Sequence, residues 1–312
     1  MIFARTAGRL WRVLTDPISR FNVWSYFHGF YKQMPDEEFL RFKFKSSLGY
    51  ALNLDNPQTL CEKLQWLKLY DRRPEYTSMV DKLAVKKIVA DKIGSEHVIP
   101  LIRVYDTFDD INFDELPEQF VLKCTHDSGG LAICRDKSTF DREAAKRKLT
   151  RSLGNNYFWI AREWPYKNVQ PRIIAEEFVD ALGKDNSIEY KLTCYNGRVK
   201  FFTICRGPAH DLWSKRTNEH YDRDFNRLNF WVNYRNPREP EKIPEQMHEL
   251  IALSDKLAEG IPQVRVDWYI ADGKIYFGEM TFFTWEGIMR FNPPEWDKIL
   301  GSWLELPTEK RM

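Results

Sequence analysis

Residues 264–281 read VRVDWYIADGKIYFGEMT, two strand-like segments joined by a tight turn at Asp272-Gly273. β-Branched and aromatic residues dominate both segments, so Asp267 and Glu279 are exceptions that could face each other across the hairpin. Two carboxylates held close together repel unless a positive charge lies between them. Hard oxygen ligands on adjacent strands suit Mg²⁺ shared with a nucleotide phosphate. The alternative interpretation is a pair of solvated acids on exposed strand faces.

The composition indicates a globular protein with two or three structural units. The chain has 312 residues, of which 43% are hydrophobic, enough to bury a large core. Its 47 basic and 45 acidic residues leave a formal charge of +2, so no global field points to nucleic acid as a partner. The five cysteines are scattered without a CxxC pair, which argues against a disulfide framework or a zinc site. A reducing cytoplasm is the expected compartment.

The N-terminal segment has a pattern typical of membrane-surface contact. No run of the chain approaches the roughly 20 apolar residues that cross a bilayer, and the pattern of a secretory signal is missing, so we expect a soluble protein. Residues 1–31 mix apolar and aromatic side chains with Arg5, Arg9, Arg12 and Arg20. A basic, aromatic helix of this kind could lie weakly on anionic lipid at the inner membrane face. The alternative is a helix packed on the body of the protein.

Helix signals dominate the first third of the chain, and mixed signals follow. Residues 36–95 read as helices that break near Asn56-Pro57 and at 71–74, and the last helix is expected from about Val80 to Ile93. The later strands are expected at 120–124, 131–134, 172–178, 189–195 and 198–205, and the later helices at 141–153 and 245–257. This order, α-rich and then mixed, indicates an α+β fold.

Lys123 ends an apolar strand directly before a flexible loop, Thr125 to Gly130. A lysine in this position can reach phosphate oxygens while the amides of the loop close over them. The spacing is not that of a P-loop, in which the glycines precede the lysine and a helix follows. The alternative is an ordinary hairpin turn beside a lysine that extends toward solvent.

The order of Asp81-Lys82, the strand 120–123 with its glycine loop, the segments 173–179 and 189–191 and the carboxylate hairpin resembles the ATP-grasp superfamily. Five phrases carry a closer likeness to one group of that superfamily. They are 52–60 (LNLDNPQTL), 62–71 (EKLQWLKLYD), 80–82 (VDK), 116–123 (LPEQFVLK) and 276–279 (YFGE). The closer likeness is to the TupA-like group, which is named for teichuronopeptide synthesis and associated with bacterial surface polysaccharide loci, and it covers roughly residues 35–305. The resemblance implies an ATP-grasp fold, in which two α+β lobes sandwich ATP. The implied organisation is an α-rich region at 1–75, a small lobe with a glycine flap at 76–178 and a large lobe with metal-binding carboxylates at 179–312.

The resemblance also implies nucleotide-binding roles. Lys82 and Lys123 would bring positive charge to the α- and β-phosphates of ATP. The hinge between the lobes would read adenine through its backbone, and Glu189 would accept from a ribose hydroxyl. The full set implied is Lys82, Lys123, His126, Ser128, Gly129, Gly130, Glu176, Glu177, Phe178, Val179 and Glu189.

The implied metal ligands are Asp267, Glu279 and Thr281, which would bind Mg²⁺. Arg265 would face the transferred phosphoryl group as a catalytic residue, together with Lys123 and Lys191. Many ATP-grasp enzymes end this motif with Glu-x-Asn, so Thr281 departs from the pattern as a weaker neutral ligand. In the TupA-like group the acid before the Tyr-Lys pair is commonly Asp, whereas this chain has Glu189 before Tyr190-Lys191.

The expected activity is an ATP-dependent carboxylate–amine ligase that acts through an acylphosphate. Its expected partners are a carboxylate substrate, such as a uronic acid of a surface polysaccharide, and an amine donor. A kinase that stops after phosphoryl transfer is the main alternative. A glycosyltransferase, which can also use paired acids with a divalent metal, is a further alternative, and a catalytically dead binding module is disfavoured because the lysines and carboxylates are retained. Residues 206–245 show little periodicity and could form either a substrate-covering loop or an irregular surface excursion.

Overall fold

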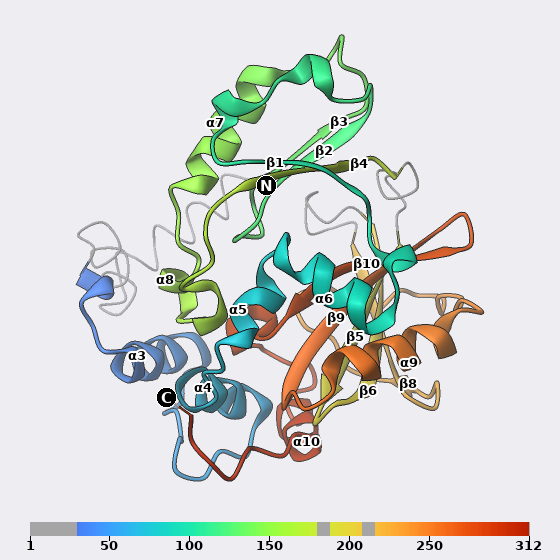
Figure 1. Cartoon of the computed structure of the whole chain (residues 1–312). Coiled ribbons are helices and arrows are strands. Elements are labelled where there is room, and N and C mark those ends of the chain that lie inside the picture. The colour runs from blue at the N-terminus through green and yellow to red at the C-terminus, as the bar shows by residue number, and fades with distance from the viewer. Residues whose placement is uncertain (1–29, 180–187, 208–215, 312) are drawn as a thin grey trace, which may run out of the picture.

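The computed structural model describes residues 30–179, 188–207 and 216–311 of the chain (Figure 1). The segment 1–31, expected at a membrane surface, therefore lies almost entirely outside the described residues. Within the described ranges, no helix combines the length and the apolar character needed to cross a membrane.

Eight α-helices and ten strands lie within these ranges. The helices are α3 (Asp36–Leu48), α4 (Leu60–Tyr70), α5 (Glu75–Val80), α6 (Ala84–Ile93), α7 (Arg142–Leu153), α8 (Phe158–Ala161), α9 (Met247–Ala258) and α10 (Trp296–Trp303). The strands are β1 (Leu101–Tyr105), β2 (Phe120–Cys124), β3 (Leu131–Cys134), β4 (Ile173–Glu177), β5 (Ile188–Tyr195), β6 (Arg198–Arg206), β7 (Thr217–Asp222), β8 (Arg227–Leu228), β9 (Gln263–Ala271) and β10 (Lys274–Thr281). Short 3-10 turns, including η7 (Thr284–Gly287), join several of them.

One expected helix boundary and the expectation for one region are wrong. The helix expected from Val80 begins only at Ala84, because Val80 ends α5 and the Asp81 carboxylate accepts a hydrogen bond from the Leu83 amide at 2.8 Å. The region 206–245, expected to form either a substrate-covering loop or an irregular surface excursion, contributes β7 and β8 to a sheet. The sequence of β7, TNEHYD, is too polar to show a strand pattern, but its backbone pairs in full with β6.

The first sheet has four antiparallel strands in the order β1-β4-β2-β3 and lies across the top of Figure 1 with α7 on its outer side. Side chains of β2 alternate between the two faces, as a strand requires. Phe120, Leu122 and Cys124 are buried in a small core with α7, whereas Val121 and Lys123 face the second sheet.

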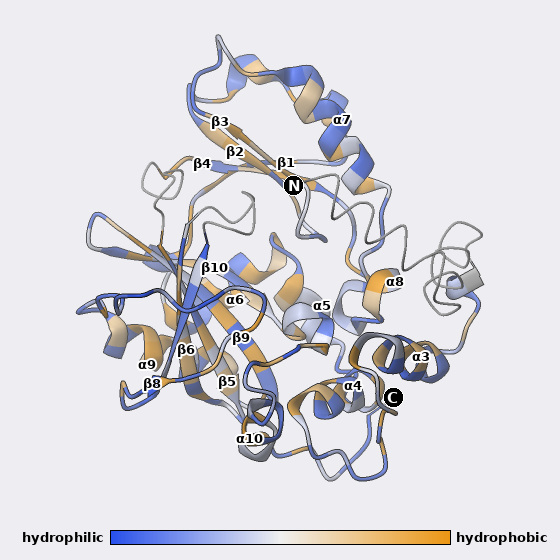
Figure 2. Cartoon of the chain, turned by 180° about the vertical axis from the view of Figure 1, so that it is seen from behind, coloured by the Kyte–Doolittle hydropathy of each residue, from blue (hydrophilic) through white to orange (hydrophobic). Residues whose placement is uncertain are grey.

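The second sheet has six antiparallel strands in the order β10-β9-β5-β6-β7-β8. Hydrophobic and polar residues are interleaved along its strands (Figure 2). The hydrophobic set of β5, β6 and β9 packs on α9, where the Trp268 indole donates to the Ser254 hydroxyl at 2.8 Å. The polar set consequently lies on the opposite face, toward the four-stranded sheet.

The N-terminal helices are tied to the C-terminal end of the chain. Helix α4 begins with a capping box at Thr59 and Glu62, which satisfies the first free amides of the helix. It lies against α10, where the Cys61 amide donates to Asp297 at 2.9 Å and the Lys63 ammonium donates to the Gly301 carbonyl at 2.8 Å. This contact holds α4 and the adjoining η7 beside the end of the six-stranded sheet.

The contact between α4 and α10 leaves no room for a side chain at Gly301. A Cβ atom there would lie 2.7 Å from the Leu60 nitrogen and 2.8 Å from the Thr59 carbonyl carbon. We therefore expect Gly301→Ala to lower the free energy of unfolding by about 1–3 kcal/mol, although helix propensity alone would favour alanine. Urea denaturation of this variant, beside Ser302→Ala at the exposed neighbouring position, measures the effect. Equal midpoints for Gly301→Ala and the wild type would contradict it.

Candidate functional site

A cavity of about 1050 Å³ lies between the facing surfaces of the two sheets. The four-stranded sheet contributes Val121, Lys123 and Glu176 to its upper wall, and the six-stranded sheet contributes the polar side chains of β5, β9 and β10 to its lower wall. Most of the residues singled out by the sequence line this one cavity.

Asp267 and Glu279 lie directly opposite each other in the register of β9 and β10, as the hairpin pattern predicts. We call them the acid pair. A β-bulge at Gly278 shifts the register just before Glu279. A Cβ atom at Gly278 would lie 2.9 Å from the Tyr269 ring and 3.0 Å from the Asp267 carbonyl oxygen, so only glycine fits the bulge.

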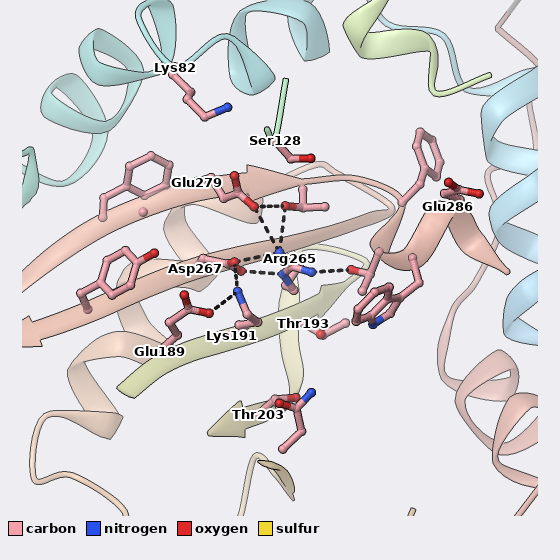
Figure 3. Close-up of a pocket in the computed structure, with 18 of the residues that line it drawn as sticks. Lys82, Ser128, Glu189, Lys191, Thr193, Thr203, Arg265, Asp267, Glu279 and Glu286 are labelled. Atoms are coloured by element: carbon pink, nitrogen blue, oxygen red, sulfur yellow. Dashed lines mark hydrogen bonds and ion pairs between the residues drawn. The ribbon is translucent and has the colours of Figure 1, made fainter. Parts of the chain in front are cut away.

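The positive charge that the acid pair needs is supplied by Arg265 (Figure 3). Its Nε donates to Asp267 Oδ1 at 2.5 Å, and its terminal nitrogen donates to Asp267 Oδ2 at 2.7 Å and to Glu279 Oε1 at 3.3 Å. The same nitrogen donates to the Thr281 hydroxyl at 3.1 Å, which in turn donates to Glu279 at 3.0 Å. The carboxylates of the pair are therefore held together by one guanidinium.

The donor set at the acid pair fits a magnesium ion that shares its coordination with phosphates. Mg²⁺ is usually held by one or two carboxylates together with substrate phosphates and waters. The acid pair and the Thr281 hydroxyl offer such oxygens. Over residues 30–179, 188–207 and 216–311 no cluster of three or more His, Cys, Asp or Glu side chains could hold a metal by itself. A metal at the acid pair would thus need further ligands from a bound molecule.

Lys191 and Glu189 extend the charge network along β5 (Figure 3). The Lys191 ammonium donates to Asp267 and lies 3.1 Å from Glu189, whose carboxylate also pairs with Arg216 at 2.6 Å. Burial raises the pKa of Glu189, but the charges of Lys191 and Arg216 outweigh it and lower the pKa to about 2. Burial lowers the pKa of Lys191, but Asp267 outweighs it, so the pKa lies above its ordinary value. Both groups are therefore ionised at neutral pH.

The upper wall is built around Glu176, whose carboxylate is buried. It lies 2.5 Å from the Lys86 ammonium and 2.6 Å from that of Lys123. Burial raises the pKa of Glu176, but the two lysines outweigh it and lower the pKa. The sequence interpretation used only the backbone of Glu176 and missed Lys86. The available signal for Lys86 was its position one helical turn after Lys82.

The glycine loop divides between the cavity and α7. Asp127, Ser128 and Gly130 line the cavity, and Lys82 donates to the Asp127 carbonyl oxygen. His126 turns the other way, because its Nε2 donates to carbonyl oxygens at the end of α7, including that of Ser152 at 3.0 Å. His126 and Gly129 are not part of the cavity lining.

The two glycines of this loop do not have positive φ angles. Gly130 is required for a different reason, because a Cβ atom there would lie 2.6 Å from both the Cβ and the Sγ of Cys124. Glu177, Phe178 and Val179, which follow on β4 and its exit, line the cavity at the expected hinge.

Sequence reasoning missed two further walls of the cavity. One comes from the six-stranded sheet and carries uncharged polar groups, namely Thr193, Thr203, Asn218, His220 and Gln263. The other comes from the segment around the 3-10 turn η5 (Trp164–Tyr166) and includes Tyr157, Glu163 and Tyr166. Burial raises the pKa of the Glu163 carboxyl group to about 7, although Lys68 partly offsets the effect. None of these residues belongs to a local motif, so their sequence gave no signal.

The chain was compared with known families, curated proteins and solved structures. Residues 62–305 match the family model described as TupA-like ATPgrasp. No curated protein gives a significant match.

Solved structures with similarity to the chain include two ligases and a synthetase. The D-alanine–D-alanine ligase from Bacillus anthracis complexed with ATP has 17% identity and a TM-score of 0.38, over 71% of this chain and 57% of that chain. D-cycloserine synthetase DcsG has 15% identity and a TM-score of 0.41, over 73% of this chain and 71% of that chain. The ATP-grasp ligase PsnB, complexed with a phosphomimetic variant of its minimal precursor, Mg and ADP, has 10% identity and a TM-score of 0.41. The match covers 86% of this chain and 68% of that chain.

The two buried ion pairs of Glu176 should contribute strongly to stability. Glu176→Gln leaves two ammonium groups facing an uncharged amide, and we expect the free energy of unfolding to fall by about 3 kcal/mol. Guanidinium denaturation measures this loss. The matched control is Glu177→Gln, the same change at the exposed neighbour, which should stay within about 0.5 kcal/mol of the wild type. A similar small loss in both variants would show that the pairs are not stabilising.

Proposed function

Because the chain belongs to the TupA-like ATP-grasp family, we propose that it is an ATP-dependent ligase that joins a carboxylate to an amine. ATP-grasp enzymes use ATP and Mg²⁺, and their fold holds the nucleotide between two α+β lobes. In the proposed division, residues 76–178 form the lobe with the glycine flap and 179–312 the lobe with the acid pair. The observation that carries the proposal is the acid pair, neutralised by Arg265, beneath a wall that presents lysines.

The proposed nucleotide site follows from the residues that line the cavity. Lys82, Lys123 and Ser128 would contact phosphate oxygens, since all three lie around the same space as the acid pair. The backbone at 177–179 would read adenine, and Glu189 would accept from a ribose hydroxyl. We assign His126 a different role from the expected contact, because its hydrogen bonds to α7 would anchor the loop.

Asp267, Glu279 and Thr281 are the proposed residues that would hold Mg²⁺. When bound, the ion would neutralise phosphate charge and orient the transferred group. The acid pair can serve because both carboxylates already point to one side of the hairpin, where Arg265 holds them. Arg265 and Lys191 would stabilise the negative charge that develops on the transferred phosphoryl group.

The proposed reaction has two steps that share one site. A carboxylate oxygen of the acceptor attacks the γ-phosphorus, and the bond to the bridging oxygen breaks, which releases ADP. The amine nitrogen then attacks the acyl carbon, phosphate leaves with the electrons of its C–O bond, and the nitrogen loses a proton. The protein contributes positioning and charge neutralisation, so no covalent nucleophile is needed.

The proposed acceptor is a uronic acid, or a similar carboxylate, of a bacterial surface polysaccharide such as a capsule, a teichuronopeptide-like polymer or an O-antigen. The amine donor would be an amino acid or a simple amine. The association of the TupA-like group with polysaccharide loci supports this choice. A cytoplasmic enzyme, with any membrane contact made through residues 1–31, fits the supply of ATP.

A kinase that phosphorylates a sugar hydroxyl is the second candidate, and one observation favours it. In the described part of the cavity, the cations nearest the acid pair already have acidic partners, because Arg265 binds the acid pair and Lys191 binds Asp267 and Glu189. A neutral hydroxyl acceptor would need no further cation. A carboxylate acceptor would have to share a cation with the acids that already bind it.

The metal role of the acid pair predicts the effect of neutral replacements. Asp267→Asn and Glu279→Gln keep the shape of each side chain but lose the charge that holds Mg²⁺, so ATP turnover should fall by about 100-fold or more. Coupled detection of ADP measures turnover, and circular dichroism checks the fold. Asp272→Asn, the same change at the exposed turn of the same hairpin, should retain full activity. Unimpaired turnover in either acid-pair variant would remove the metal assignment.

Trapping with hydroxylamine separates the ligase from the kinase. An acylphosphate formed from Mg·ATP and a uronic acid should react with hydroxylamine to give a hydroxamate and one ADP for each, without the natural amine. A kinase acting on a hydroxyl should give a phosphorylated sugar and no hydroxamate. Mass spectrometry of the products and an ADP assay distinguish the two outcomes. A phosphorylated sugar in the absence of hydroxamate would replace the ligase proposal with the kinase.

A further inference from the structure

One part of the cavity has a distinct chemistry that the charged residues do not explain. It comprises Thr193, Thr203, Asn218, His220 and Gln263, which we call the neutral wall. These side chains come from β5, β6, β7 and β9 and line the same cavity as the acid pair. They offer hydroxyl, amide and imidazole groups without a net charge.

The register of the sheet connects the neutral wall to the acid pair. One row of directly paired residues crosses five strands, and it runs Glu279, Asp267, Lys191, Thr203 and His220. Directly paired residues project on the same face of a sheet. Neighbouring strands lie about 4.8 Å apart, so His220 is about 14 Å across the sheet from Asp267. Thr203 and His220 of the neutral wall therefore lie on the same row across the sheet as the acid pair.

Three side chains of the neutral wall keep a buried polar atom without a hydrogen-bond partner among the described residues. They are Asn218 Oδ1, His220 Nε2 and Gln263 Oε1, on residues that are 8%, 6% and 4% exposed. Buried polar atoms of native proteins are nearly always paired, because an unpaired one loses its hydration without compensation. Asn218 and His220 lie two residues apart on the same face of β7, so one bound molecule can supply the partners of both. Gln263 lies at the other end of the sheet, where it pairs with Tyr195.

His220 is held in place and kept uncharged. Its Nδ1 lies 2.8 Å from the Thr203 hydroxyl, and its ring stacks on Phe230 with centroids 4.1 Å apart at an angle of 9°. Burial lowers the pKa of His220 to about 3, so the ring is neutral at physiological pH. The free Nε2 therefore acts as a fixed hydrogen-bonding group and not as a charge.

We infer that the neutral wall is a hydroxyl-binding subsite that selects a polyhydroxylated acceptor. Asn218 accepts a hydrogen bond from one hydroxyl group of the acceptor, and His220 bonds a second. A molecule without hydroxyl groups would leave these two polar atoms unpaired, and this is the strongest kind of discrimination a binding site achieves. The inference rests on the proposed function, for which it supplies the substrate class. The ribose of ATP also carries hydroxyl groups, so the test must distinguish binding of the acceptor from binding of the ribose.

The experiment uses the full chain with Mg²⁺ and a non-hydrolysable ATP analogue, to which hexuronates are added. D-glucuronate, D-galacturonate and D-mannuronate are compared by calorimetry with cyclohexanecarboxylate, which has the charge and ring size but no hydroxyl groups. At least one hexuronate should bind, and cyclohexanecarboxylate should bind at least about 100-fold more weakly, since several hydrogen bonds are missing. Binding of cyclohexanecarboxylate as tight as that of the hexuronates, or no hexuronate binding, overturns the inference.

Variants of the neutral wall show whether the subsite binds the acceptor or the ribose of ATP. His220→Phe keeps the ring stack and Asn218→Leu keeps the volume, and each should weaken hexuronate binding about 10-fold while leaving affinity for the ATP analogue within about twofold. His220→Gln, which restores a hydrogen-bonding group, should recover part of the loss. His248→Phe, the same change at an exposed position, is the control. Weaker binding of the ATP analogue instead would assign these atoms to ribose and overturn the inference.

The outcomes also separate this inference from the ligase proposal. A hexuronate that binds through the neutral wall but yields a sugar phosphate and no hydroxamate leaves the subsite standing and removes the ligase. Hydroxamate formed equally well from a carboxylate without hydroxyl groups leaves the ligase standing and removes the subsite. If His220→Phe does not fold, Thr203→Val tests the same point, because it removes the hydroxyl beside His220 Nδ1.

Discussion

The guanidinium of Arg265 allows two carboxylates to lie opposite each other on the cavity face of the six-stranded sheet. Helix α9 covers the other face of that sheet. Without a counter-charge, two carboxylates held this close would repel each other. The same neutralisation continues through Lys191 to Glu189, so cations and anions alternate from one polar residue to the next. Glu189 at the end of this network thereby stays an anion at neutral pH, and only in that form can a carboxylate bind a divalent cation.

The upper and lower walls have different electrostatic characters. Lys86 and Lys123 share one buried acid, Glu176, so this cluster of the upper wall carries an excess of positive charge. The lower wall is nearly neutral until a cation arrives, and it then becomes positive as well. A polyphosphate entering with its metal would meet compensating charge on both sides. The neutral wall lies beyond this region, which separates the binding of charged groups from the binding of uncharged ones.

Local sequence patterns predicted the features that depend on neighbouring residues. The hairpin of β9 and β10, the acid pair and the loop after Lys123 all follow from alternation and turn residues within about 20 positions. The pairing of Glu176 with Lys86 joins residues far apart in the chain, and no local pattern encodes such a contact. Strand β7 was missed because five of its six residues, all except the buried Tyr221, are polar or charged, so it has no apolar alternation to detect. Asn218 and His220, which line the cavity, were missed with it.

The bulge at Gly278 also limits how this protein can evolve. Side chains of β10 keep their assignment to cavity or core only while the strand retains its present phase relative to β9. Substitutions can therefore alter one cavity group at a time. A regular ladder of the same length would pair Gly278 with Asp267 and turn Glu279 from the cavity to the face that α9 covers. The hairpin can therefore tolerate substitutions around it only while the bulge at Gly278 is kept.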